Sequence, residues 1–285
     1  MTIRRGVPML VLSAVLAATG CADDSGDDTS PGSSAPAPAE PASSSPTRAP
    51  FQVMDGPLRR CGPQPAAASE AGFRYLRLRD PDVGTVPAIR AGSGRTALVL
   101  LHQTDGNGLC GWLEFATLLA DDPDLSLLAI DLCKYGASRC TKVADETFAP
   151  ADQVDAVEMA VRYARETQRA RRVVVMGASM GGSVAMMAAA GLPGIDAAVD
   201  LSGPVGWSGM EAVREGRALP VPVLVAMADQ EGPEEVRGAR RIVRNAPKGS
   251  ELVPAEAGHG YELLVGMDGS PTPIAERVLS WIAAP

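Results

Sequence analysis

Histidine is scarce in this sequence, where His102 and His259 are the only two among 285 residues. No His and Cys cluster has metal-ligand spacing, and neither a P-loop nor a dinucleotide-binding glycine fingerprint occurs. Positive charge is also in deficit, because 26 Lys and Arg face 34 Asp and Glu and give a formal net charge of -8. Such a charge repels phosphate backbones. We therefore expect no metal site, no cofactor and no nucleic-acid partner.

A hydrophobic run long enough for a permanent membrane span is lacking as well. The apolar stretch from Val7 to Ala18 follows Arg4 and Arg5, and it falls short of the roughly 20 residues that a spanning helix needs. A basic start, a short apolar stretch and small residues at its end are typical of a secretory signal peptide. We assign residues 1–20 to this peptide and exclude them from the fold.

Only five cysteines occur, which is an odd number for an exported protein. The segment from Ala18 to Cys21 resembles a bacterial lipobox, which implies that Cys21 is acylated and becomes the mature N-terminus. The chain would then be a cell-membrane lipoprotein facing outside. The alternative is a plain secreted protein, cleaved near Ala18, in which Cys21 is a spare thiol.

Lipidation of Cys21 would leave four cysteines, which is enough for two disulfides. We expect Cys133 to pair with Cys140, because the two bracket the loop after the fourth predicted strand at a separation that can be closed. Cys61 and Cys110 would then form the second pair.

A segment rich in Asp, Ser, Ala and Pro follows the expected lipidation site, from Ala22 to about Pro50. It has too few large apolar residues to bury the surface that folding requires, and its prolines keep it extended. We assign residues 21–55 to a disordered linker and residues 56–285 to one folded domain.

Within that domain, short apolar runs alternate with amphipathic stretches, which indicates a parallel sheet covered by helices on both faces. The expected strands are Phe73–Leu78, Val86–Arg90, Ala97–Leu101, Leu125–Ile130, Val173–Met176, Ala197–Leu201, Val221–Met227 and Glu251–Pro254. The expected helices are Gly111–Ala120, Ala151–Thr167, Met180–Ala190, Glu234–Asn245 and Thr272–Ala283. The first two strands fit an antiparallel hairpin at the edge of the sheet.

The most informative motif is Gly177-Ala178-Ser179-Met180-Gly181, a GxSxG pattern between a buried strand and an Ala-rich helix. A nucleophile on such a tight turn has strained backbone angles, and side chains at positions 177 and 181 would collide with the neighbouring strand and helix. Ser179 is the candidate nucleophile. The turn also aims the helix N-terminus at the site, so the backbone N–H of Met180 is a candidate oxyanion donor.

A serine nucleophile needs a base, and only two histidines are available. His259 follows the last predicted strand and comes after Ser179 in the chain, so it is the candidate base. His102 ends the third predicted strand, and we expect it to be structural.

With these motifs the sequence resembles the α/β hydrolases from about Phe73 to Pro285, and Asp131, Gly136 and Ser138 after the fourth strand match the same pattern. The resemblance implies the α/β-hydrolase fold, with a mostly parallel eight-stranded sheet. It also implies a second oxyanion N–H in the loop after His102, at Thr104 with Gln103 beside it. Gln103 stands where the family usually has glycine.

The carboxylate that orients the histidine follows the seventh strand in this family, where both Asp229 and Glu231 occur. Strand register counted from Pro222 favours Glu231, whereas residue type favours Asp229. Both are candidates.

Family members often carry a cap domain after the sixth strand, but the stretch from Leu201 to Val221 leaves room for little more than a loop and one helix. The resemblance is thus to capless esterases and dienelactone-hydrolase-like enzymes, acting on a small-molecule or lipid-like ester. Acyl transfer with the same triad, or a catalytically silent binding protein of this fold, is the alternative. We expect an open substrate pocket that includes Trp112, Met180, Trp207, Met210, Leu263 and Leu264, with a place in the core as the alternative for Trp112.

Overall fold

The structure is a computed structural model that describes residues 51–105, 107–141 and 153–284. The predicted signal peptide, Cys21 and nearly all of the predicted linker lie outside the described residues. No helix in the described ranges has the length and apolar character needed to cross a membrane.

The central element is a nine-stranded sheet in the order β11-β10-β9-β8-β5-β6-β4-β3, with the two-residue β7 paired to β4. Its strands are β3 (Arg74–Asp80), β4 (Gly84–Gly92), β5 (Thr96–Leu101), β6 (Leu125–Ile130), β7 (Arg139–Cys140), β8 (Arg172–Ala178), β9 (Ala197–Leu201), β10 (Val223–Ala228) and β11 (Glu251–Ala255). All eight predicted strands are present. β7 was missed because two residues give no periodic signal, so the count of eight was one too low.

Strands β5, β6, β8, β9, β10 and β11 pair in parallel, whereas β3 and β4 form an antiparallel hairpin at one edge. The expected edge hairpin is confirmed. β5 lies between β6 and β8, so the chain leaves β5 toward one side of the sheet and later returns to the other. Ligands of open α/β sheets bind at the carboxyl ends of the strands next to such a reversal.

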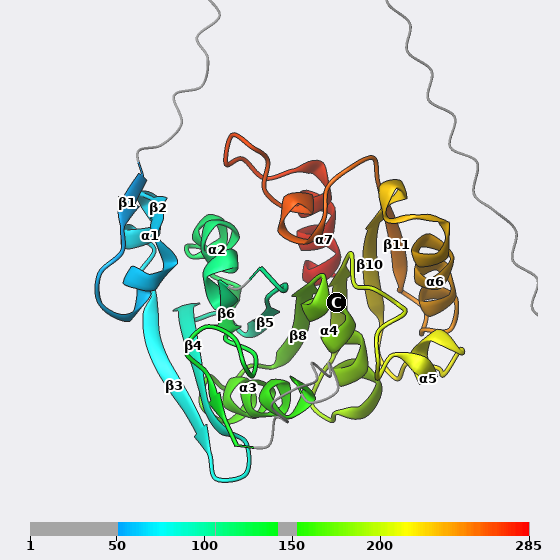
Figure 1. The fold of residues 1–285 in the computed structure, drawn as a ribbon, viewed down its shortest axis with the longest axis horizontal. Coiled ribbons are helices and arrows are strands. Elements are labelled where there is room, and N and C mark those ends of the chain that lie inside the picture. The colour runs from blue at the N-terminus through cyan, green and yellow to red at the C-terminus, as the bar shows by residue number, and fades with distance from the viewer. Residues whose placement is uncertain (1–50, 106, 142–152, 285) are drawn as a thin grey trace, which may run out of the picture. The chain divides into compact units, whose positions relative to one another are not determined.

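Two hydrophobic cores, one on each face, bury the helices against the sheet. The helices are α1 (Ala67–Glu70), α2 (Leu113–Leu119), α3 (Val154–Glu166), α4 (Met180–Gly191), α5 (Glu211–Arg214), α6 (Pro233–Arg244) and α7 (Pro273–Ala283). Helices α3, α4 and α6 contribute to one core, and α2 and α7 to the other. Figure 1 shows α2 and α7 on the upper side of the sheet and α3 on the lower side.

Alternation within the strands explains why both faces are covered. In β5, Val99 faces the core with α3 and α4, while Leu98 and Leu100 face the core with α2 and α7. Val174 and Val175 of β8 divide in the same way. A strand buried on both sides has no polar face, which is why these strands read as continuous apolar runs.

The N-terminal part of the domain adds a small two-stranded sheet that the sequence did not reveal. β1 (Phe51–Val53) pairs antiparallel with β2 (Pro63–Pro65) across the 3-10 helix η1 (Gly56–Cys61). Regular structure therefore begins four residues before the expected linker end at 55. The sequence signal was weak because three-residue strands that contain proline resemble a linker.

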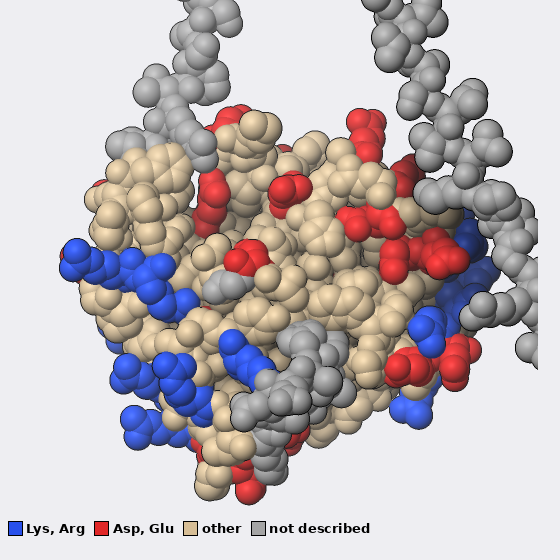
Figure 2. Space-filling model, viewed as in Figure 1, with Lys and Arg blue, Asp and Glu red and all other residues tan. Residues whose placement is uncertain are grey.

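Charge is unevenly distributed over the molecule. Arg74, Arg77 and Arg79 are exposed along the edge strand β3, and Figure 2 shows many basic side chains over the β3–β4 end and acidic ones near α5 and α6. Charged side chains on an edge strand oppose pairing with another sheet. The charge thus protects the open edge of this sheet.

Candidate active site

Ser179 occupies the turn between β8 and α4, with φ +51° and ψ −119°. Non-glycine residues rarely adopt such angles, and strain of this kind is concentrated at functional sites. A Cβ on Gly177 would lie 1.9 Å from the carbonyl oxygen of Gly181, and a Cβ on Gly181 would lie 2.2 Å from the carbonyl oxygen of Leu101. The steric reason predicted for the two glycines is therefore present in the structure.

His259 lies in the loop after β11 and is paired with one of the two candidate acids. Its Nδ1 lies 2.7 Å from Oε1 of Glu231, the last residue of η4 (Asp229–Glu231) after β10. Asp229 begins the same turn and is exposed, whereas the Glu231 side chain is only 18% exposed. The structure thus selects Glu231 as the partner of His259, as the strand register indicated.

The hydrogen bond to Glu231 also fixes the chemistry of the imidazole. With the proton on Nδ1 donated to the carboxylate, Nε2 carries the lone pair. The loop is held near the serine turn, because Gly260 packs so closely on Ala178 that a Cβ at 260 would lie 3.3 Å from that of Ala178. Gly260 is the neighbour of His259 in the chain and Ala178 is the neighbour of Ser179, so this contact brings the candidate base and nucleophile into the same region.

The candidate oxyanion donors differ in how their backbone N–H groups are used. Met180 is the first residue of α4, and the first N–H groups of a helix have no intrahelical partner. Gln103 donates its N–H to the Tyr261 Oη at 3.0 Å, so this group is occupied, and the expectation that it serves an oxyanion is not supported. Thr104 is exposed, and its N–H has no hydrogen-bond partner among the described residues.

His102 fixes the direction of that Thr104 N–H. Its Nδ1 donates to the carbonyl oxygen of Gln103 at 2.8 Å, and its Nε2 accepts from the Leu132 N–H at 2.9 Å. Because a trans peptide is planar, the Thr104 N–H points opposite to the held carbonyl. Burial lowers the pKa of His102 below its ordinary value, which keeps the ring in the neutral form that this bonding pattern needs.

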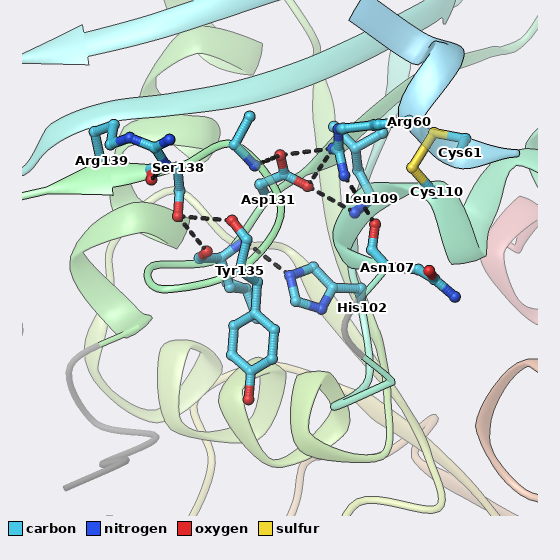
Figure 3. A network of polar contacts seen from close by, with 12 residues as sticks. Arg60, Cys61, His102, Asn107, Leu109, Cys110, Asp131, Tyr135, Ser138 and Arg139 are labelled. Carbon is cyan, nitrogen blue, oxygen red and sulfur yellow. Dashed lines mark hydrogen bonds and ion pairs between the residues drawn. A yellow bond between two sulfur atoms is a disulfide. The ribbon is translucent and has the colours of Figure 1, made fainter. Parts of the chain in front are cut away.

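A buried carboxylate lies in the same region, as Figure 3 shows, between Arg60 and Leu109. Asp131, directly after β6, is fully buried and accepts from the N–H groups of Leu109 and Ala137 at 2.8 and 2.9 Å. Arg60 Nη2 donates to both of its oxygens, at 2.8 and 2.7 Å, and Arg60 Nη1 donates to the Asn107 carbonyl at 3.0 Å. The sequence analysis missed Arg60, although a buried carboxylate requires a cation or several donors.

Both predicted disulfides are present. Cys61–Cys110 joins η1, which carries Arg60, to η2 (Gly108–Trp112) after the His102 loop. Cys133–Cys140 closes the loop that follows β6. The two covalent links therefore flank the Asp131 network.

The sequence analysis also missed a second buried carboxyl group, that of Asp200. It lies in β9 opposite Gly177 of β8. Burial raises its pKa from 3.8 to about 7, because the Gly203 N–H, 2.6 Å from Oδ1, compensates only part of the lost hydration and Glu235 adds repulsion. Its signal in the sequence was a single Asp within an apolar strand.

The predicted substrate pocket is not supported. Trp112, Met180, Met210, Leu263 and Leu264 are at most 1% exposed, so they belong to the cores. Trp207 is half-buried. Apolar composition could not distinguish a pocket wall from a core.

The short connection predicted between β9 and β10 is confirmed. It contains only the four-residue α5, so no cap domain is inserted there. Within the described ranges, no group of three or more His, Cys, Asp and Glu side chains could hold a metal ion.

Comparisons with known proteins agree with this architecture. Residues 98–215 match the model of the alpha/beta hydrolase family. No curated protein matches the sequence significantly.

Three similar solved structures come from bacteria and an archaeon. An esterase from Pyrococcus furiosus is 15% identical, with a TM-score of 0.59 over 83% of this chain and 97% of that one. A serine hydrolase without a lid from Xanthomonas campestris is also 15% identical, with a TM-score of 0.53 over 75% and 96%. A protein assigned as a dienelactone hydrolase from Klebsiella pneumoniae is 18% identical, with a TM-score of 0.55 over 75% and 100%.

Sequence identities this low establish only the fold, so the reaction must be inferred from the residues of the site. The sheet order, the strained serine turn and the match over residues 98–215 agree with one another, and the described part of the chain therefore has the α/β-hydrolase fold, with no cap domain between β9 and β10.

Proposed function

We propose that this protein is a serine hydrolase that cleaves a carboxylic ester through Ser179, His259 and Glu231. The observation that carries the proposal is the pairing of His259 Nδ1 with Glu231 Oε1 at 2.7 Å, in the loop that packs beside the strained Ser179 turn. A carboxylate on Nδ1 leaves Nε2 to accept a proton.

The reaction would proceed in two halves. His259 Nε2 takes the Ser179 hydroxyl proton while Oγ bonds to the ester carbonyl carbon, and the oxyanion is stabilised by the N–H groups of Met180 and Thr104. The carbonyl re-forms as the C–O bond to the alcohol breaks, and the alcohol leaves with the proton from His259. Water then attacks the acyl-enzyme by the same route and releases the acid and free Ser179.

Solvent access to the base favours a substrate that enters from an open surface. The His259 side chain is 40% exposed, and the connection between β9 and β10 inserts only the four-residue α5. We propose esters of small to moderate size, or the exposed ester of a lipid-like molecule.

The proposed location is outside the cytoplasm, with the chain anchored through a lipid on Cys21. Two disulfides in the described chain support an oxidising compartment, because such bonds are rare in the cytosol.

Labelling with a fluorophosphonate tests the function, together with hydrolysis of 4-nitrophenyl esters of increasing acyl length. We expect the protein to be labelled and to hydrolyse at least one ester, and Ser179→Ala to lose both activities while its melting temperature stays close to that of the unsubstituted protein. Labelling of the Ser179→Ala protein would refute the nucleophile. Absence of hydrolysis with labelling intact would favour acyl transfer, which an assay with added alcohol acceptors would detect.

A further inference from the structure

The loop after β5 and the loop after β11 make direct contact through Gln103 and Tyr261. These residues are 158 positions apart in the sequence, and the Gln103 N–H donates to the Tyr261 Oη at 3.0 Å. The first loop carries Thr104, whose N–H is the proposed oxyanion donor, and the second carries His259. The contact therefore joins the two loops on which the proposed reaction depends.

The phenol is fixed in place by packing. The Tyr261 ring lies edge-on to Trp112, with ring centroids 5.0 Å apart, and Trp112 is fully buried. Burial also raises the pKa of Tyr261 well above its ordinary value, so the hydroxyl stays protonated and neutral. An acceptor held this firmly can define the position of its donor.

The Gln103 side chain makes a second contact between the same loops. A Cβ at Gly260, where φ is +58°, would lie 2.2 Å from Gln103 Oε1. Gly260 therefore gives the space that a glutamine requires in this loop. Gln103 stands where the family usually has glycine. Its side chain fits here because the neighbouring loop has a glycine, Gly260, at the point of contact.

Both backbone polar groups of Gln103, its N–H and its carbonyl, are thus hydrogen-bonded. Tyr261 holds its N–H, and His102 holds its carbonyl oxygen at 2.8 Å. The peptide that carries the held carbonyl also carries the Thr104 N–H, so a rotation of Gln103 would turn that N–H away from the reacting carbonyl.

We propose that Tyr261 is a positioning residue, whose hydroxyl fixes Gln103 and thereby aims the Thr104 N–H at the oxyanion. This inference rests on the proposed function. It adds that the loop after β11, which carries His259, and the loop after β5, which carries Thr104, move as one unit, because Tyr261 is two residues from His259.

Tyr261→Phe tests the inference, because it keeps the ring against Trp112 and removes only the acceptor. With 4-nitrophenyl butyrate we expect kcat to fall about 10-fold, which is less than the roughly 10²-fold or greater loss when an oxyanion donor is deleted outright. KM should change less than about 2-fold, because the contact acts on the charged transition state. The inhibition constant of a trifluoromethyl ketone, which binds as a tetrahedral oxyanion, should rise by the same factor as kcat falls.

Tyr75→Phe is the matched control, because Tyr75 lies on the edge strand β3, away from both loops, and should leave all three constants unchanged. Amide hydrogen exchange of Gln103 gives a readout independent of turnover and should accelerate in Tyr261→Phe. Unchanged kcat and inhibition constant, or unchanged exchange at Gln103, would overturn the inference. If the unsubstituted protein is neither labelled by fluorophosphonate nor active on esters, it is the proposed function that fails.

Discussion

The choice between the two carboxylates that follow β10 can be tested by removing each charge with little change in shape. Glu231→Gln keeps the length of the side chain that lies 2.7 Å from His259 Nδ1, and Asp229→Asn makes the same chemical change two residues earlier, on an exposed side chain. Of the two side chains, only Glu231 contacts the imidazole, and it is also the less exposed one.

The magnitude follows from the charge that develops on His259 in the transition state. Two unit charges about 4 Å apart attract by about 4 kcal/mol at an effective dielectric constant of about 20, a value suited to the protein surface. At roughly 1.4 kcal/mol per tenfold change in rate, this corresponds to a loss of about 10³ in kcat. The amide can also hold the imidazole in the wrong tautomer, which brings comparable swaps in other triads to about 10⁴.

The assay is steady-state hydrolysis of the best 4-nitrophenyl ester at pH 7.5, with thermal unfolding as the control for folding. We expect Glu231→Gln to lose about 10³ in kcat at nearly unchanged KM, and Asp229→Asn to lose less than about 2-fold. Equal losses from the two variants, or a larger loss from Asp229→Asn, would refute the assignment of Glu231.

Three other predictions concern stability and processing. Because burial raises the folded-state pKa of Asp200 to about 7, the folded protein keeps a proton between pH 4 and 7 that the unfolded chain loses. The free energy of unfolding should therefore fall by about 3 kcal/mol from pH 5 to pH 8 relative to Asp200→Asn, and parallel denaturation profiles of the two proteins would contradict this. Replacing Cys61 and Cys110 by alanine should destabilise the fold by about 4 kcal/mol on the chain-entropy model, measured by urea unfolding, and a change below about 1 kcal/mol would argue against it. Intact-mass analysis of the membrane fraction should find a lipid on Cys21, and a mature chain that starts elsewhere would exclude the anchor.

The sequence alone determined eight strands of the main sheet, the presence of helices on both of its faces, and the candidate serine and histidine. Two-sided burial forces continuous apolar runs such as Val173–Val175, and this local pattern can be read without tertiary contacts. The Ser179 turn requires glycine at positions 177 and 181, so its signature can be read within five residues, although the group that Gly181 must avoid is the Leu101 carbonyl of the neighbouring strand. The cysteine pairs could also be predicted, because setting Cys21 aside leaves four cysteines and the short loop between Cys133 and Cys140 limits the possible pairings.

Only the tertiary structure decided which groups meet across the loops. Asp229 and Glu231 differ by two positions in one turn, so the partner of His259 depends on how that turn is oriented relative to β11. Arg60 reaches Asp131 over 71 residues, and Tyr261 reaches Gln103 over 158. Hydrogen bonds at such separations leave no periodic trace in the sequence, because their geometry is set by how elements far apart in the chain pack against one another.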